Sequence, residues 1–234
     1  MTPHLLARLQ AARATATPIV LATNLATGDQ LLLPDDDAPA ALKDHATRAL
    51  QADRSTTIQL DDATWFLHAH TPPMRLVVVG AVHIAQALVP MAARLGYAVF
   101  VTDPRRAFAN EDRFPGVTVS TDWPDEALDA ACPDTRTAIV TLTHDPKLDD
   151  PALDRALRSP AFYIGALGSR KTHAARLDRL RALGHDDALA RIHGPIGLRI
   201  GAVTAGEIAL SIMGEIIATR RGAAAPVVPR GAQP

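Results

Sequence analysis

The chain has 234 residues, which is enough for one large domain or two small ones. Its 24 Lys and Arg nearly balance its 25 Asp and Glu, and a net charge of −1 argues against a surface built to bind nucleic-acid phosphates or anionic lipid. Apolar residues make up 47% and charged residues 21%, a globular composition that excludes wholesale disorder. The single cysteine, Cys132, excludes a disulfide framework and a cysteine-based zinc site, and we predict no metal site.

No segment approaches the roughly 20 apolar residues that a membrane-spanning helix needs. The first residues, MTPHLLARLQAARA, lack the basic and apolar regions of a signal peptide. We therefore expect a cytoplasmic protein that binds neither membrane nor nucleic acid.

The first part of the chain predicts a small α+β domain, because its apolar residues change between helical and strand periodicity. The expected elements are helices over 2–14 and 40–52, and strands over 18–24, 30–34, 56–60 and 64–69. Thr71-Pro72-Pro73 then marks a boundary. We expect domains over 1–72 and 73–222, followed by a disordered Pro-rich tail over 223–234.

The second domain alternates strands with helices, which predicts an α/β fold with a Rossmann-like, doubly wound parallel sheet. Strands are expected over 75–80, 97–103, 116–120, 137–144 and 161–168, with a short extended piece over 197–202. Helices are expected over 83–96, 124–132, 152–159, 170–183 and 207–221. Pro90 should kink or break the first of these helices. Ligands of such sheets bind beyond the carboxyl ends of the strands, so the residues that follow each strand are the candidates for a site.

The turn after the first of these strands reads Gly80-Ala81-Val82-His83. A dinucleotide fingerprint, G-x-G-x-x-G/A, has a second glycine where Val82 stands, so the match is weak and an ordinary turn remains the alternative. Asp103 follows Gly80 by 23 residues, near the spacing of an acid that binds a ribose hydroxyl. Arg105 could hold a phosphate, or the whole segment could be a solvated turn.

Thr143, His144 and Asp145 follow the fourth strand. A histidine beside an aspartate at this edge could transfer a proton or bind a polar ring, while the alternative is a loop that caps the next helix. We expect Asp150, before Pro151, to be that cap and His144 to belong to the site.

Gly168 and Ser169 lead into a helix whose first turn carries Arg170 and Lys171. The amide groups, the helix dipole and the two cations all favour an anion, and cations in a first turn are unfavourable without one. This is the strongest site signal in the chain.

Thr204 to Glu207 forms a capping box, whereas Glu215 lies either on a solvated helix face or toward a cleft.

The motifs together resemble the XdhC/CoxI family of accessory proteins of xanthine dehydrogenase and related molybdenum hydroxylases. The matching stretches are RLVVVGAVHIAQAL, VFVTDPR, RFP, AIVTLTHDPKLDDPAL, FYIGALGSRKT, PIGLRIGA and TAGEIALSIMGEII, in family order over residues 75–219. The resemblance implies a Rossmann-type C-terminal domain that binds molybdenum cofactor (molybdopterin), protects it and helps to insert it into a target enzyme. It implies no turnover of a substrate. The chain departs from the family at Val82 and lacks the family's N-terminal glycine-rich and cysteine-containing segment, so it resembles a shortened member.

This resemblance leads us to predict a molybdenum cofactor-binding chaperone with no catalytic residues. The predicted cofactor-binding residues are Gly80, His83, Asp103, Arg105, Thr143, His144, Asp145, Gly168, Ser169, Arg170, Lys171 and Glu207. The expected partners are a molybdenum hydroxylase apo-enzyme of the xanthine dehydrogenase or CO dehydrogenase type, a cysteine desulfurase and a second copy of the chain. The alternatives are an NAD(P)-dependent oxidoreductase, against which Val82 counts, and an interaction subunit that has lost its ligand.

Overall fold

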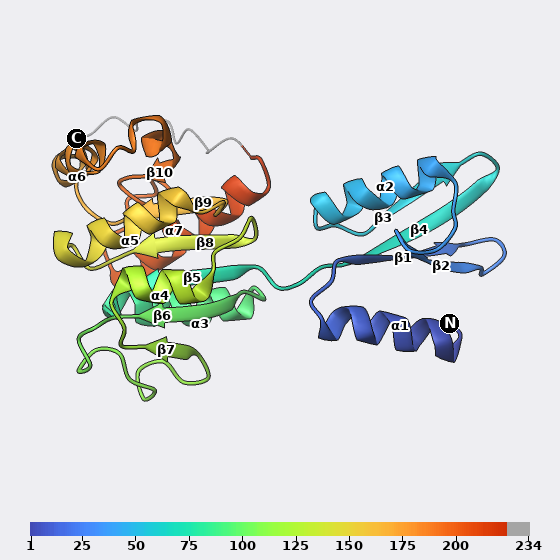
Figure 1. The fold of residues 1–234 in the computed structure, drawn as a ribbon, viewed down its shortest axis with the longest axis horizontal. Helices are drawn as coiled ribbons and strands as arrows, with labels where there is room; N and C mark the ends of the chain where they lie inside the picture. The colour runs from blue at the N-terminus through green and yellow to red at the C-terminus, as the bar shows by residue number, and fades with distance from the viewer. Residues whose placement is uncertain (224–234) are drawn as a thin grey trace. The chain divides into compact units, whose positions relative to one another are not determined.

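A computed structural model describes residues 1–223, and the rest of the predicted tail, residues 224–234, lies outside the described residues. The chain divides between Pro72 and Pro73 into two compact units. Each unit has its own sheet and its own buried core (Figure 1).

The N-terminal unit is a four-stranded antiparallel sheet in the order β2-β1-β4-β3. Its strands are β1 (Ile19–Asn24), β2 (Gln30–Leu33), β3 (Thr56–Leu60) and β4 (Ala63–His70), and its helices are α1 (Pro3–Ala14) and α2 (Ala40–Gln51). The two helices lie on opposite faces of the sheet, so both faces of β1 are covered (Figure 1). Val20 and Ala22 pack toward α2, whereas Ile19 and Leu21 pack toward α1.

The C-terminal unit is a six-stranded parallel sheet in the order β10-β9-β8-β5-β6-β7, which is the Rossmann strand order. Its strands are β5 (Arg75–Val79), β6 (Ala98–Thr102), β7 (Thr118–Ser120), β8 (Thr137–Thr141), β9 (Tyr163–Ala166) and β10 (Ile192–His193). Its helices are α3 (His83–Arg94), α4 (Pro124–Ala131), α5 (Pro146–Arg158), α6 (Arg170–Ala182) and α7 (Ala205–Arg220), with a short 3-10 helix, η1 (Asp186–Arg191). The predicted fold class is confirmed.

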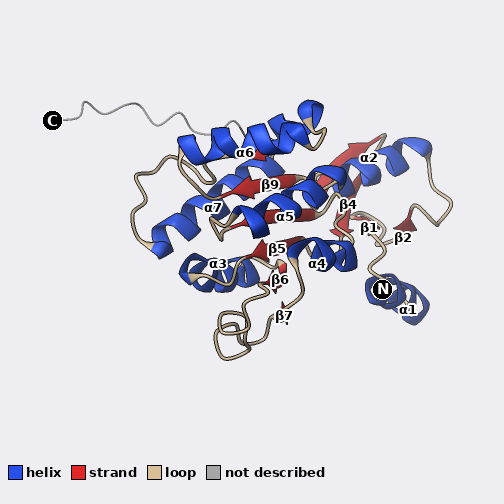
Figure 2. Ribbon diagram, turned by 60° about the vertical axis from the view of Figure 1, so that its left-hand side comes forward, coloured by secondary structure: helices blue, strands red, loops and turns tan. Residues whose placement is uncertain are grey.

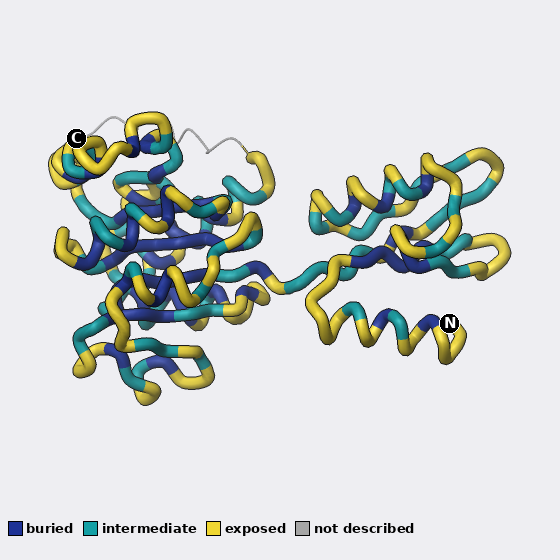
Figure 3. Tube along the Cα trace, in the orientation of Figure 1, coloured by how far each residue is buried: buried dark blue, intermediate teal, exposed yellow. Residues whose placement is uncertain are grey.

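Helices cover both faces of this parallel sheet (Figure 2). Leu76 and Val78 of β5 pack with α3 and α7, whereas Val77 and Val79 pack with α4, α5 and α6. The central strands β5 and β8 are therefore buried on both sides, which accounts for their unbroken apolar sequences (Figure 3).

Helix α3 continues through Pro90 to Arg94, so the proline does not break it. Two other predicted elements differ from the structure. Helix α5 begins at Pro146 instead of near residue 152, because Asp145 caps it and Pro146 occupies its first turn; Asp150 is therefore inside the helix and is not its cap. The piece over 197–202 is a loop, and the sixth strand lies earlier, at Ile192–His193.

Glu215 faces inward, so it does not lie on a solvated face of α7. Its carboxylate accepts hydrogen bonds from Tyr163 Oη at 2.5 Å and from the Gly197 amide at 2.8 Å, and it lies 3.4 Å from His193 Nδ1. Burial opposes ionisation of Glu215, but the hydrogen bonds from His193, Tyr163 and Gly197 outweigh it and hold the pKa below its usual value. Glu215 therefore fixes the loop after β10 against α7 and β9.

Among the described residues, no helix is both long and apolar enough to cross a bilayer.

We predict that Glu215→Gln lowers the free energy of unfolding by about 1.5–3 kcal/mol, the range for hydrogen bonds to a charged group. Glu207→Gln, which removes a charge from the exposed end of the same helix, should cost less than Glu215→Gln, because solvent screens that charge. Urea unfolding followed by circular dichroism measures both. Equal losses in the two variants would contradict the role given to Glu215.

Candidate functional site

The loops that follow four neighbouring strands meet at the carboxyl edge of the parallel sheet. The strand ends are in register, since Val79 pairs with both Thr102 and Thr141, and Thr141 pairs with Ala166. The loops after β5, β6, β8 and β9 therefore lie side by side. These loops and the first residues of the helices that follow them carry all but one of the predicted site residues, the exception being Glu207.

The first turn is packed tightly against the loop after β8. Gly80 has φ +107°, and a Cβ atom there would lie 2.6 Å from Thr143 Cγ2. Only glycine satisfies both the backbone conformation and this close approach. Val82 follows as the residue before α3 and offers no side-chain cap, while His83 is exposed at the first position of the helix.

Asp103 binds within the chain and leaves nothing free for a ligand. Its Oδ2 accepts from the Ala81 amide at 2.9 Å and from Arg105 Nη2 at 2.8 Å. Its Oδ1 accepts from the amide and the Nε of Arg105, at 3.0 and 2.9 Å. A carboxylate has about four acceptor sites, so these four bonds fill them, and the side chain is 0% exposed. Asp103 therefore ties the first turn to β6 and is not available to a ribose hydroxyl.

The pKa of Asp103 is consistent with that role. Burial raises it, but the hydrogen bonds from Arg105 and Ala81 outweigh burial and hold it below its usual value. Arg105 itself stays 39% exposed and lies over the ring of Phe108, with 4.7 Å from Cζ to the ring centroid. Arg105 is thus paired with Asp103, and part of its guanidinium group remains at the surface of the edge.

The loop after β8 holds an exposed histidine in a strained conformation. His144 has φ +63°, a left-handed conformation that few residues other than glycine adopt. Thr143 Oγ1 donates to Asp149 Oδ1 at 2.7 Å and accepts from the Asp145 amide at 3.1 Å, which fixes the backbone on both sides of His144. The Asp145 carboxylate accepts from the Lys147 amide at 2.9 Å, so it is the cap of α5.

The turn after β9 presents two cations at the start of α6. Gly168 has φ +145°, and a Cβ atom there would lie 3.3 Å from Thr172. Ser169 is the N-cap, and its Oγ accepts from the Thr172 amide at 3.1 Å. Arg170 and Lys171 are exposed and form no hydrogen bond or ion pair with the described residues. Their charges oppose the helix dipole, so an anion bound here would relieve that repulsion.

Sequence reasoning missed a buried residue beneath this turn. Arg176, on α6, contacts both Asp149 and the carbonyl of Leu167. The available signal was its place four residues before the buried Leu180, on the inward face of the helix. Glu207, in contrast, was assigned to the site, but its Oε2 accepts from the amides of Val203 and Thr204, both at 2.8 Å, in the predicted capping box.

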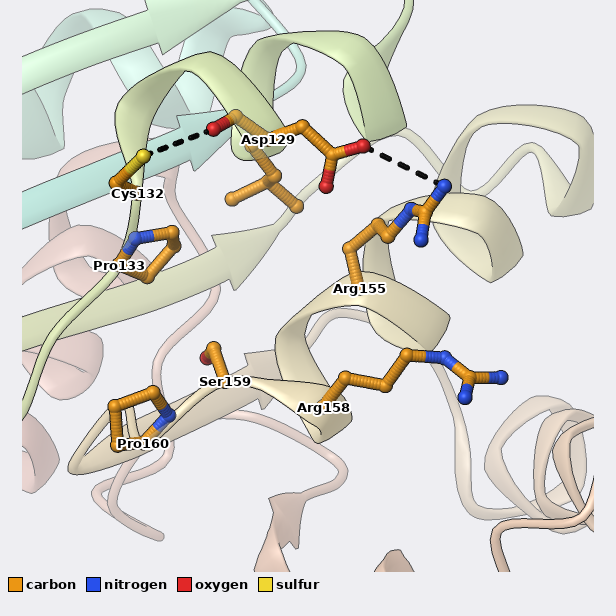
Figure 4. A pocket seen from close by; sticks show the side chains of 8 residues that line it. Asp129, Cys132, Pro133, Arg155, Arg158, Ser159 and Pro160 are labelled. Atoms are coloured by element: carbon orange, nitrogen blue, oxygen red, sulfur yellow. Dashed lines mark hydrogen bonds and ion pairs between the residues drawn. The ribbon is translucent and has the colours of Figure 1, made fainter.

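A hollow lies at the opposite, amino-terminal edge of the sheet, where α4 and α5 end. It has a volume of about 250 Å³ and is lined by Cys132, Arg155 and Arg158, among others (Figure 4). Arg155 pairs with Asp129 at 3.4 Å, and Arg158 pairs with Asp154 at 2.9 Å. The cations of this hollow are thus neutralised within the chain, unlike those at the start of α6.

We predict that Asp103→Asn lowers the free energy of unfolding by about 1.5–3 kcal/mol at neutral pH, because it removes charged acceptors from Ala81 and Arg105. The folded-state pKa of Asp103 is depressed, so the stability it adds is fully present above the ordinary pKa of about 3.9 and is lost as the pH falls below it. Unfolding measured from pH 7 down to pH 3 checks this. A stability difference that stayed constant over that range would contradict the assignment.

Comparison with known proteins places these loops in a recognised domain. Residues 76–216, more than half of the chain, match the family described as the XdhC Rossmann domain. The chain is 33% identical over 150 residues to the molybdenum cofactor insertion chaperone PaoD of Escherichia coli K12, covering 64% of this chain and 41% of PaoD. It is 33% identical over 157 residues to a probable xanthine dehydrogenase subunit of Bacillus subtilis 168, covering 67% of this chain and 46% of that protein.

A solved structure described as a xanthine dehydrogenase from Bacillus halodurans has the same fold. It is 22% identical, with a TM-score of 0.71, over 97% of this chain and 66% of that chain. The chain spans only 29–46% of the length of the curated relatives that it matches. The matched segment runs from the second residue of β5 past β10 and includes every loop of the carboxyl edge, and the chain therefore belongs to the XdhC Rossmann-domain family.

Proposed function

We propose that this chain binds molybdenum cofactor at the carboxyl edge of its parallel sheet and acts as an accessory protein in the maturation of a molybdenum hydroxylase of the xanthine dehydrogenase type. The observation that carries the proposal is the pair of exposed cations, Arg170 and Lys171, at the start of α6, with no counter-charge from the described residues. The relative named as a molybdenum cofactor insertion chaperone supports the same role.

The residues of the edge fit the two ends of such a cofactor. A phosphate requires donors and positive charge, which the first amides of α6, Arg170 and Lys171 supply. A pterin ring presents polar edges, and His144 and Arg105 place polar groups at the surface of other loops of this edge. When bound, the cofactor supplies the molybdenum centre of the recipient enzyme, and this chain's own groups hold and orient it.

The alternative of an NAD(P)-dependent oxidoreductase lacks support at the first turn. A nicotinamide dinucleotide needs backbone access to its pyrophosphate, where Val82 stands, and an acid free to bind ribose. Asp103 is fully engaged by Ala81 and Arg105. The geometry favours a ligand whose phosphate lies at α6 instead of at α3.

The proposed partners follow from the same role. We propose that the chain acts in the cytoplasm and delivers cofactor to an apo-hydroxylase, with a cysteine desulfurase as the source of sulfur for the cofactor. A second copy of the chain is also proposed as a partner. Leu210 and Ile217 support this, because they lie seven residues apart on α7 and are 57% and 36% exposed.

We predict that Arg170→Ala combined with Lys171→Ala weakens molybdopterin binding by at least about 1.5–3 kcal/mol, the range for one charged hydrogen bond. Equilibrium dialysis, with the retained pterin measured by fluorescence, gives the affinity. The matched control removes Arg155 and Arg158, two arginines that are paired at the opposite edge. If both double variants bind equally, the cofactor does not use the start of α6.

We also predict that the purified protein reduces neither NAD nor NADP in the presence of an aldehyde or a purine. Absorbance at the wavelength of reduced nicotinamide checks this, with a known dehydrogenase as the positive control. Sustained reduction at a rate proportional to protein concentration would instead favour the oxidoreductase.

A further inference from the structure

Arg176 is a charged residue buried directly beneath the turn that starts α6. Its side chain is 2% exposed. Its Nη2 donates to the Leu167 carbonyl at 2.8 Å and lies 3.3 Å from Asp149 Oδ2. The other two guanidinium nitrogens, Nε and Nη1, have no hydrogen-bond partner among the described residues. Leaving such donors unpaired in a protein interior is costly, so ordinary packing does not account for an arginine at this position.

Asp149 is the buried partner of Arg176, and it reaches a different loop. Its side chain is 1% exposed, and its Oδ1 accepts from Thr143 Oγ1 at 2.7 Å. Burial raises the pKa of Asp149, while the hydrogen bond from Thr143 and the charge of Arg176 act against that rise. The carboxylate thus bridges the loop after β8 and helix α6.

These contacts form one continuous path across the edge. It runs from the Leu167 carbonyl through Arg176 and Asp149 to Thr143, and Thr143 in turn accepts from the amide of Asp145. One end holds the backbone before the cations of α6, and the other holds the backbone around His144. The path therefore joins the two loops that carry the proposed phosphate and pterin contacts.

We propose that Arg176 is a positioning residue of the carboxyl edge. Together with Asp149 it holds loops 143–145 and 167–169 at the separation needed to bind both ends of the cofactor. This inference rests on the proposed function, because the ligand it concerns is the cofactor. Exchanging a buried ion pair for apolar residues is often neutral or stabilising, so fold stability alone gives little reason for the pair. Fixing the relative geometry of two loops gives a sufficient reason.

A neighbouring ion pair provides a matched control. Arg179, three residues farther along α6, donates from Nη2 to Asp150 Oδ1 at 3.0 Å. This pair also joins α6 to α5, but Arg179 is 41% exposed, and within residues 1–223 its hydrogen bonds reach Asp150 and the Ala175 carbonyl and neither of the two loops. Arg179→Gln therefore removes an ion pair between the same two helices and leaves every hydrogen bond of the path in place.

The test compares wild type, Arg176→Gln, Arg176→Lys and Arg179→Gln in molybdopterin dialysis and in amide hydrogen exchange. In Arg176→Gln we expect at least a tenfold loss of affinity, with faster exchange confined to 143–145 and 167–169. Arg176→Lys should recover part of both losses, because an ammonium group still donates to Leu167. Arg179→Gln should bind within about twofold of wild type and leave exchange in the two loops unchanged.

Several results would overturn the inference. Arg176→Gln could bind as tightly as Arg179→Gln, or its exchange could rise uniformly over α5 and α6 instead of in the two loops. If Arg176→Gln does not fold, Thr143→Val interrupts the path with little change in volume, because valine neither donates to Asp149 nor accepts from Asp145, and unchanged exchange in both loops would then refute the positioning role. If wild type binds no molybdopterin, the proposed function fails, and the exchange measurement still decides whether Arg176 holds the loops.

Discussion

The carboxylate of Asp149, buried between Thr143 and Arg176, is the group on which the arrangement of the loops at the carboxyl edge most depends. Parallel pairing brings the ends of the strands together, but it does not determine how the loops beyond them are held. Asp149 supplies that connection for the loops after β8 and β9. Asp103 does the same for the turn after β5 and the loop after β6, because it binds Ala81 and Arg105 at once. Two buried carboxylates thus hold all four loops of the edge.

The two carboxylates differ in what they leave available to a ligand. Asp103 fills its own acceptor sites and so removes the group that would bind a ribose at the first turn. Asp149 holds the loop that contains His144 and, through Arg176, the turn before α6. The exposed side chains of that loop and turn remain available to a ligand. The proposed site therefore lies at the β8 and β9 loops instead of at the β5–α3 turn, where a dinucleotide-binding Rossmann domain holds its ligand. At the opposite edge, Arg155 and Arg158 are each paired with an aspartate, in contrast to the two cations at the start of α6.

Much of the fold could be predicted from the sequence, because apolar strands and helix starts are recognised from residues that are close together in the chain. The alternation after residue 74 predicted the doubly wound sheet, and Gly168 to Lys171 stood out because cations in a first turn are locally unfavourable. The start of α5 was misplaced because Asp150-Pro151 imitates a cap, whereas Asp145-Pro146 is the true one. The role of Asp103 depends on the amide of Ala81, 22 residues away, and the Arg176–Asp149 pair spans 27 residues. Contacts at such separations leave no periodic trace in a single sequence.

The most direct test of the account is a crystal structure of the chain with molybdopterin bound, in which the position of the phosphate is measured. We predict a phosphate at the first amides of α6, within reach of Arg170 and Lys171, and a pterin ring beside His144. A phosphate found instead at the turn from Gly80 to His83, with the start of α6 facing solvent, would contradict it.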